Sequence, residues 1–264
     1  MSAMHNKFSA GRLNTHRILT FSAFAAVIAL WCILTYGGIV EKVFLPSPGA
    51  VLMAFAGMYR DNILIYYTLV SIYRVMVGWA IAVIAAVPLG MLIGTSKRAE
   101  ALFEPAVDFA RYLPVVALVP LTLLYFGIGD LQKFVIIFLG TFFQLVLMVS
   151  DVVSGVQRDL LRASATLGAS KWQTYYLVLI PASMPGIMDN LRITVGWAWT
   201  YLVVAELVAA NSGVGYMILK AQRFLATDRI FAGLVIIGLV GLGTDYLFKW
   251  LTGLIVPWRE KVGD

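Results

Sequence analysis

Four charged residues interrupt long apolar stretches of this sequence: Arg74, Arg192, Glu206 and Asp245. A charged side chain inside a bilayer is costly, about 2.5–3.5 kcal/mol for an arginine at its centre, so it faces a cavity or a partner. Two chemistries fit this pattern. Either Arg74 and Arg192 make a pathway across the membrane attractive to an anion, or Arg–Glu and Arg–Asp pairs hold neighbouring helices together.

Arg192 shares a helical stripe with Gly196 and Trp199, four and seven residues further on. Gly196 leaves space on this stripe, and Trp199 is a candidate gate. Glu206 lies fourteen residues on, about 21 Å along a helix, which is too far to neutralise Arg192 within the same helix. We therefore predict that Arg74 and Arg192 face the pathway or a neighbouring helix, with Glu206 as a further pathway candidate, and that neither arginine faces lipid.

A polar segment, "RASATLGASKWQTYYLVLIPASMPGI" at 162–187, lies between two apolar runs. It belongs to a connection, 151–183, that is much longer than the roughly 2–8 residues common between helices of a bundle. Its charges cluster before and within a short helical pattern that Gly168 interrupts. This connection is predicted to be a docking element.

Several kinds of active site are absent from the sequence. No G-x-x-x-x-G-K-[ST] loop occurs, and "GTSK" at 94–97 resembles one only superficially. The two histidines, His5 and His16, lie near the N-terminus, no paired-carboxylate cluster occurs, and Cys32 is the single cysteine. We therefore predict no enzyme, no cofactor in this chain and no metal site.

The composition is that of a membrane protein, because 61% of the 264 residues are hydrophobic and only 13% are charged. Each long apolar run approaches the roughly 20 residues that a helix needs to cross a bilayer. The sequence therefore predicts an all-α membrane protein with six transmembrane helices, near 18–40, 66–94, 103–127, 131–150, 184–210 and 230–252.

The distribution of positive charge predicts the orientation. The flanks on one side of the six spans hold twelve Lys and Arg residues, among them Arg17, Arg111 and Lys171, and those on the other side hold six. The richer side should be cytoplasmic, with a tail at 1–17 and another at 259–264 around a transmembrane region, 18–258. The net charge of +6 thus reflects topology, and no nucleic-acid binding is expected. The first apolar run is too long for a signal-peptide core, so it should remain uncleaved.

Two further features concern the path of the chain. Pro114 and Pro120 interrupt the third span and predict a broken or kinked helix, which is a candidate pathway wall or a simple kink in a packed helix. Gly90 and Gly94 form a G-x-x-x-G pair that favours close helix packing. The segment that follows "LPSP" at 45–48 is predicted to be an amphipathic interfacial helix.

The stretch "RASATLGASKWQTYYLVLIP" at 162–181 resembles the cytoplasmic signature of binding-protein-dependent ABC importer permeases: E-A-A, three residues, Gly, nine residues, then I-x-L-P. Its spacing is intact, although Arg replaces the leading Glu and Ser the second Ala, as in the taurine, sulfonate, nitrate and bicarbonate class. "YLPVVALVPLTLLYFGIGD" at 112–130, "LRITVGWAWTYLVVAEL" at 191–207 and "GVGYMI" at 213–218 extend the resemblance. The positions carried over from the signature are Arg162, Ala163, Ser164, Gly168, Val178, Ile180 and Pro181.

The resemblance implies a type I ABC importer permease of the bacterial inner membrane, with both termini cytoplasmic. It implies a homodimer that works with two ATPase subunits, which hold ATP and Mg, and with an extracytoplasmic solute-binding protein. A coupling helix would dock on the ATPase, where small residues allow close approach and Leu167 and Trp172 serve as apolar anchors. The transported solute would be a small anion. The alternative is a secondary transporter driven by an ion gradient, which should show an inverted repeat; none is evident between the two halves.

Overall fold

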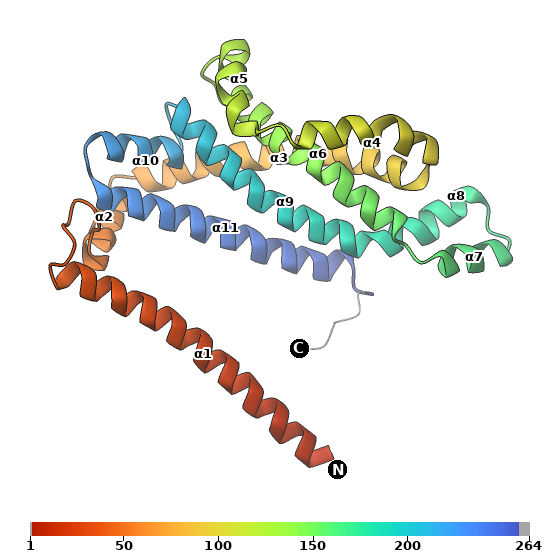
Figure 1. Ribbon diagram of the computed structural model, residues 1–264, viewed down its shortest axis with the longest axis horizontal. Coiled ribbons are helices and arrows are strands. Elements are labelled where there is room, and N and C mark those ends of the chain that lie inside the picture. Colours follow the sequence, from red (N-terminus) through yellow and green to blue (C-terminus); the bar gives the residue numbers. More distant parts are fainter. Residues whose placement is uncertain (1, 259–264) are drawn as a thin grey trace. The chain divides into compact units, whose positions relative to one another are not determined.

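The computed structural model describes residues 2–258, with side chains from residue 19 onward. Within this range every regular element is a helix and no strand occurs (Figure 1). The elements are α1 (Ser2–Tyr36), α2 (Pro48–Arg60), α3 (Ile63–Thr95), α4 (Lys97–Arg111), η1 (Val115–Leu118), α5 (Val119–Phe126), α6 (Asp130–Ser154), α7 (Arg158–Thr166), α8 (Lys171–Gln173), η2 (Thr174–Leu179), α9 (Ile180–Val208), α10 (Val214–Arg223) and α11 (Thr227–Ile255).

The chain forms two compact units. The first comprises the chain up to Asn62 together with Lys220–Ala232, and the second comprises Ile63–Leu219 and the chain from Gly233 onward. Helix α1 continues through the predicted N-terminal tail, whereas the predicted C-terminal tail, 259–264, lies outside the described residues.

The first unit contains the predicted amphipathic helix, α2. Ser47 caps its N-terminus, with Oγ accepting from the Ala50 N–H, and Pro48 occupies the first turn, where a missing N–H costs nothing. The indole of Trp31 on α1 donates to the Pro46 carbonyl at 2.9 Å and stacks on Phe231. The turn before α2 is thereby tied to α1.

Five of the described helices are long and apolar enough to cross a membrane, and a bent pair of helices at the remaining predicted span meets the same criterion when its two helices are taken together. This pair, α4 and η1–α5, is bent by 81°. The break follows from Pro114, which takes an extended conformation before η1 and has no N–H to continue a helix. Pro120 does not interrupt a helix as predicted. It lies in the first turn of α5, which begins at Val119.

The core of the second unit is formed where α3, α6 and α9 pack against one another (Figure 1). Gly90 and Gly94 are the contact points of α3 on α6. A Cβ at Gly90 would lie 2.6 Å from the Val146 carbonyl oxygen, and one at Gly94 would lie 2.8 Å from that of Ser150. The G-x-x-x-G pair therefore allows the two backbones to approach closely, which drives helix association in lipid.

Candidate functional site

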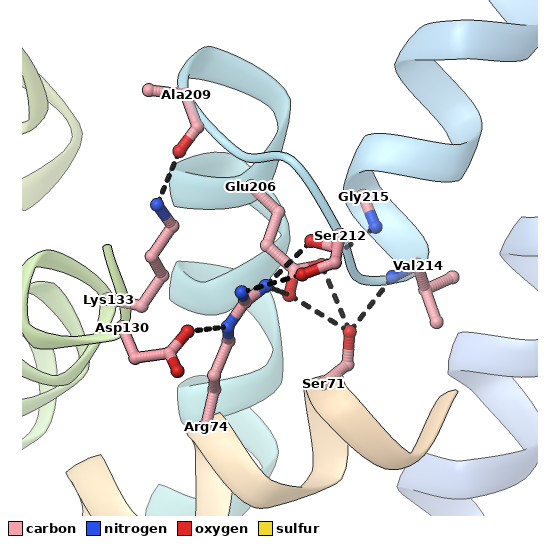
Figure 2. A network of polar contacts seen from close by, with 9 residues as sticks. All are labelled: Ser71, Arg74, Asp130, Lys133, Glu206, Ala209, Ser212, Val214 and Gly215. Carbon is pink, nitrogen blue, oxygen red and sulfur yellow. Dashed lines mark hydrogen bonds and ion pairs between the residues drawn. The ribbon is translucent and has the colours of Figure 1, made fainter. Parts of the chain in front are cut away.

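A buried polar network joins α3, α6 and α9 in the second unit (Figure 2). Arg74 on α3 donates from Nε to Oδ1 of Asp130, at the start of α6, and from Nη1 to Oε1 of Glu206, near the end of α9. Both distances are 2.7 Å. Arg74 is 5% exposed and Glu206 is fully buried, whereas the Asp130 side chain is 47% exposed, so the guanidinium links a buried carboxylate to one at the edge of the network.

Only donors surround the Glu206 carboxylate. Arg74 donates to Oε1, and the Gly215 N–H donates to Oε2 at 2.8 Å. The Ser71 hydroxyl lies 3.0 Å from both oxygens and itself accepts from the Val214 N–H, so its own proton points to the carboxylate. The site therefore requires an acceptor at both oxygens, which an ionised carboxylate provides.

The network also fixes the connection between α9 and α10. Arg74 donates from Nη1 to the Ser212 carbonyl at 2.7 Å and from Nη2 to the Ser212 hydroxyl at 3.0 Å. Gly213 has a φ of +107°, and a Cβ there would overlap the Glu206 carboxylate. Lys133 of α6, almost fully buried, donates from Nζ to the Ala209 carbonyl. The loop thus wraps around Glu206, as Figure 2 shows.

Two cations and two carboxylates therefore meet in this network, and their charges balance. Removing one partner of a buried ion pair leaves an uncompensated charge, so such a cluster is sensitive to substitution. Arg74 and Glu206 were predicted to line a pathway, but their side chains are buried within the chain and paired with each other. The alternative prediction, that an Arg–Glu pair holds helices together, describes their geometry.

Arg192 lies in a second charge cluster, between α9 and α11. Its Nε is 2.6 Å from Oδ1 of Asp245, whose Oδ2 is 2.7 Å from Nζ of Lys249. The three side chains are between 31% and 48% exposed. The predicted neighbouring helix is therefore α11, and one positive charge remains in excess on a partly open surface.

Trp199 is a buried residue of α9. It is only 4% exposed and packs in a core cluster with Val75 and Leu202, although Gly196 on the predicted stripe is open. The face of α9 that carries Trp199 is thus covered by other helices of the described chain, and a gate at Trp199 stays a prediction. Trp197 is the more open tryptophan, at 38%.

The helix break borders a cavity of about 540 Å³. Pro114 and its neighbours form one wall, and residues of α6 and α9, among them Gln144 and Thr200, form the others. The orientation prediction counted Arg111 among the residues that flank the spans on the cytoplasmic side. In the structure Arg111 is the last residue of α4, within the bent pair, and it also lines this cavity. Pro120 is not among the lining residues.

The predicted docking element is a helix–turn–helix segment formed by residues 158–179, here called the coupling segment. Helix α7 ends at Thr166, and Gly168 follows its C-cap residue Leu167 with a φ of +79°. The Gly168 N–H bonds the Ala165 carbonyl and the Ala169 N–H bonds the Ser164 carbonyl, which is the pattern of a glycine-terminated helix. Ser170 then begins α8 with a capping box completed by Gln173.

The coupling segment presents apolar side chains outward. Leu167 is 87% exposed and Trp172 is 71% exposed, with Trp172 stacked on Tyr176. Arg162 and Ala163 are also exposed, whereas Ser164 is buried and lies 3.1 Å from the Thr174 hydroxyl. Pro181, at the start of α9, accepts from the Trp258 indole. The segment is thus internally braced and leaves two large apolar anchors free.

Sequence reasoning missed most partners of the buried network: Ser71, Asp130, Lys133, Ser212, Gly213 and Gly215. Asp130 and the two glycines lie in stretches quoted for the family resemblance, "FGIGD" and "GVGYMI", so a signal for their importance was present. No periodicity links Ser71 to Glu206, which are 135 residues apart in the chain. Among the described side chains, no group of three or more His, Cys, Asp or Glu is placed to hold a metal ion.

The structure thus defines an α-helical integral membrane protein with one sharply bent apolar helix pair and an exposed helical segment between two long helices. Residues 86–261 match the family described as "Binding-protein-dependent transport system inner membrane component", and the chain belongs to this family. It is therefore the membrane permease component of an ABC importer, as the sequence predicted.

Named relatives cover nearly the whole chain. The chain is 31% identical to the taurine transport system permease protein TauC of Escherichia coli, over 92% of this chain and 90% of TauC. It is 34% identical to an SsuC protein of Bacillus subtilis named for aliphatic sulfonate transport, over 90% and 86%. It is 30% identical to the nitrate import permease protein NrtB of Synechocystis, over 90% and 89%.

Solved structures confirm the fold class. An inward-facing MetNI methionine ABC transporter matches with a TM-score of 0.61 at 19% identity, over 73% of this chain and 98% of that one. An amino acid ABC transporter crystallised with histidines matches with a TM-score of 0.60 at 15% identity, over 78% and 98%. At these identities the likeness concerns the fold alone.

Proposed function

We propose that this permease carries a small oxyanion, such as a sulfonate, taurine or nitrate, across the bacterial inner membrane. The proposal is supported by the names of three relatives that span nearly the whole chain, TauC, SsuC and NrtB. Taurine, aliphatic sulfonates and nitrate share a compact anionic group with three oxygen acceptors. A pathway that serves them needs hydrogen-bond donors and positive charge.

The coupling segment is proposed to dock on a cytoplasmic ATPase subunit, and its exposed anchors are the observation that carries this part. Leu167 and Trp172 are large apolar side chains without a covering element in the described chain. Aromatic and apolar anchors that enter a pocket commonly supply most of the energy of an interface. Both chain termini are proposed to lie on the same, cytoplasmic, side.

The complete importer is proposed to contain two copies of this chain, two ATPase subunits and an extracytoplasmic solute-binding protein. ATP and Mg are held by the ATPase, which performs the hydrolysis. The pathway is proposed to run beside the break at Pro114 and past Arg192. The Arg192 side chain is 36% exposed although it pairs with Asp245, so an anion in this pathway would meet its positive charge.

Reconstitution tests the proposal. Vesicles that hold the permease and its ATPase, supplied with binding protein and ATP, should accumulate labelled taurine, ethanesulfonate or nitrate. Omission of the ATPase should abolish this uptake. Uptake that persists on an ion gradient without the ATPase would instead identify a secondary transporter.

Docking is tested by Gly168→Trp, which places a bulky side chain in open space beside Leu167. We expect the ATPase to dissociate during purification, or ATP hydrolysis to continue without transport. Gly38→Trp is the matched control, because Gly38 is also exposed, has a φ of +70° and has open space around it. Normal ATPase yield and normal uptake with Gly168→Trp would contradict the docking role.

A further inference from the structure

The cavity at the helix break contains polar side chains that have no partner within the chain. Gln144 projects from α6, and Trp197, Thr200 and Tyr201 project from α9. Among the described residues none of these four side chains makes a hydrogen bond. Asn190 and Thr194 on α9 are bonded, whereas the buried indole nitrogen of Trp199 on the same helix is not.

These unpartnered groups lie deep in their spans. Gln144 is fourteen residues from Asp130, about 21 Å along a helix about 37 Å long. Lipid chains at that depth offer no hydrogen bonds, and an unsatisfied polar group costs free energy there. The groups therefore need water, a ligand or a partner subunit at the cavity, and the experiments below separate these.

A cation lies on the wall of the same cavity. Arg111 ends α4, fourteen residues or about 21 Å from its first residue, Lys97. Its Nε pairs with Asp108 at 3.0 Å and its Nη2 contacts the Tyr112 hydroxyl at 3.1 Å, which leaves Nη1 unbonded. Asp108 does not line the cavity, whereas Arg111 does. The guanidinium is therefore part of the cavity wall, and its paired carboxylate is not.

The size and lining of the cavity suit a small solute. Its volume of about 540 Å³ lies within the range of roughly 300–1,000 Å³ found for ligand sites. Leu139, Phe143 and Val116 add apolar surface to the lining. A sulfonate with a short organic tail has the matching combination of three acceptors and an apolar body.

We propose that this cavity is a binding station for the transported oxyanion within the permease itself. Arg111 supplies positive charge, Gln144, Thr200 and Tyr201 supply donors, and Trp197 packs against the organic part of the solute. The station deepens the proposed function and rests on it, because it assumes that the solute is an oxyanion. Its affinity should be weak, since a solute that binds tightly cannot leave.

Gln144→Leu and Thr200→Val separate this role from a structural one. Both side chains lack partners in the chain, so their apolar replacements should leave the melting midpoint of the purified permease–ATPase complex unchanged or raise it. Transport should respond differently: we expect uptake of labelled taurine and ethanesulfonate to fall about three- to tenfold, with an unequal change for nitrate, whose shape differs. Arg111→Gln should lower uptake of all three by about tenfold or more.

The control is Gln222→Leu, an exposed glutamine on α10 outside the cavity, which should leave uptake unchanged. Unchanged uptake and unchanged anion selectivity in Gln144→Leu and Thr200→Val would overturn the proposal of a binding station. Loss of assembled complex in these variants would also overturn it, because the polar groups would then serve contacts between subunits. Failure of the wild-type complex to carry any of the three anions would refute the proposed function instead.

Discussion

Replacement of Glu206 by glutamine should destabilise the protein although it changes the side chain by one atom. In the native network Oε1 accepts a hydrogen bond from Arg74 and Oε2 accepts one from the Gly215 N–H. A glutamine amide has one acceptor and one donor, so in either orientation its NH₂ group faces another donor. Rotation of the side chain cannot relieve this conflict, because Ser71 also donates to the pair of oxygens.

The magnitude follows from burial. Removing one partner of a buried ion pair costs about 3–5 kcal/mol, and the lower end applies here because Asp130 still pairs with Arg74. At about 2–4 °C per kcal/mol for a chain of this size, 3 kcal/mol lowers the melting midpoint by roughly 6–12 °C. Because the α9–α10 loop is bonded to the same carboxylate, its proteolytic sensitivity should rise as well.

The assay is the melting midpoint of the detergent-purified protein, followed by size-exclusion chromatography after heating. Glu100→Gln is the matched control, since Glu100 pairs with Lys97 at 2.8 Å on an exposed helix surface. Such a surface pair contributes about 0–1 kcal/mol, so this control should shift the midpoint by less than about 4 °C. Equal midpoints for the Glu206 and Glu100 variants would refute the argument from buried donors.

Three further substitutions test other contacts. Gly90→Leu should separate α3 from α6 and cost about 1–3 kcal/mol, measured as a lower melting midpoint, whereas Gly241→Leu, with open space around it, should not. Gly213→Ala should be more destabilising than Gly127→Ala, because both glycines have positive φ but only Gly213 abuts Glu206; equal losses would leave backbone strain as the whole cause. Arg192→Gln should slow anion uptake while complex yield and basal ATP hydrolysis persist, because Asp245 keeps Lys249 at 2.7 Å; parallel loss of complex and uptake would favour a structural pair.

The helix break shows how far local sequence rules reach. Pro114 removes an N–H and disfavours a helical conformation at Leu113, so a break near residue 114 was predictable. The same rule applied to Pro120 was wrong, because a proline in the first turn of a helix meets no such conflict. Whether a proline breaks a helix or lies in its first turn depends on where the next helix begins. Here α5 begins at Val119, beyond the 81° bend, so Pro120 lies in its first turn.

The sequence by itself determined the membrane character, the approximate spans, the coupling segment and the family. These depend on composition, on runs of about 20 apolar residues and on spacings within one motif, all of which are local properties of the chain. Gly168 belongs to this group, since its role as a helix end follows from its neighbours.

Only the tertiary structure decided which charges meet. Arg74 and Glu206 are 132 residues apart, and their pairing depends on how α3 and α9 pack. The burial of Trp199 and the gathering of Gln144 and Thr200 around one cavity depend on the same packing. The helical period places residues on a face of one helix, but the partner of that face is set by the contacts of all the helices together.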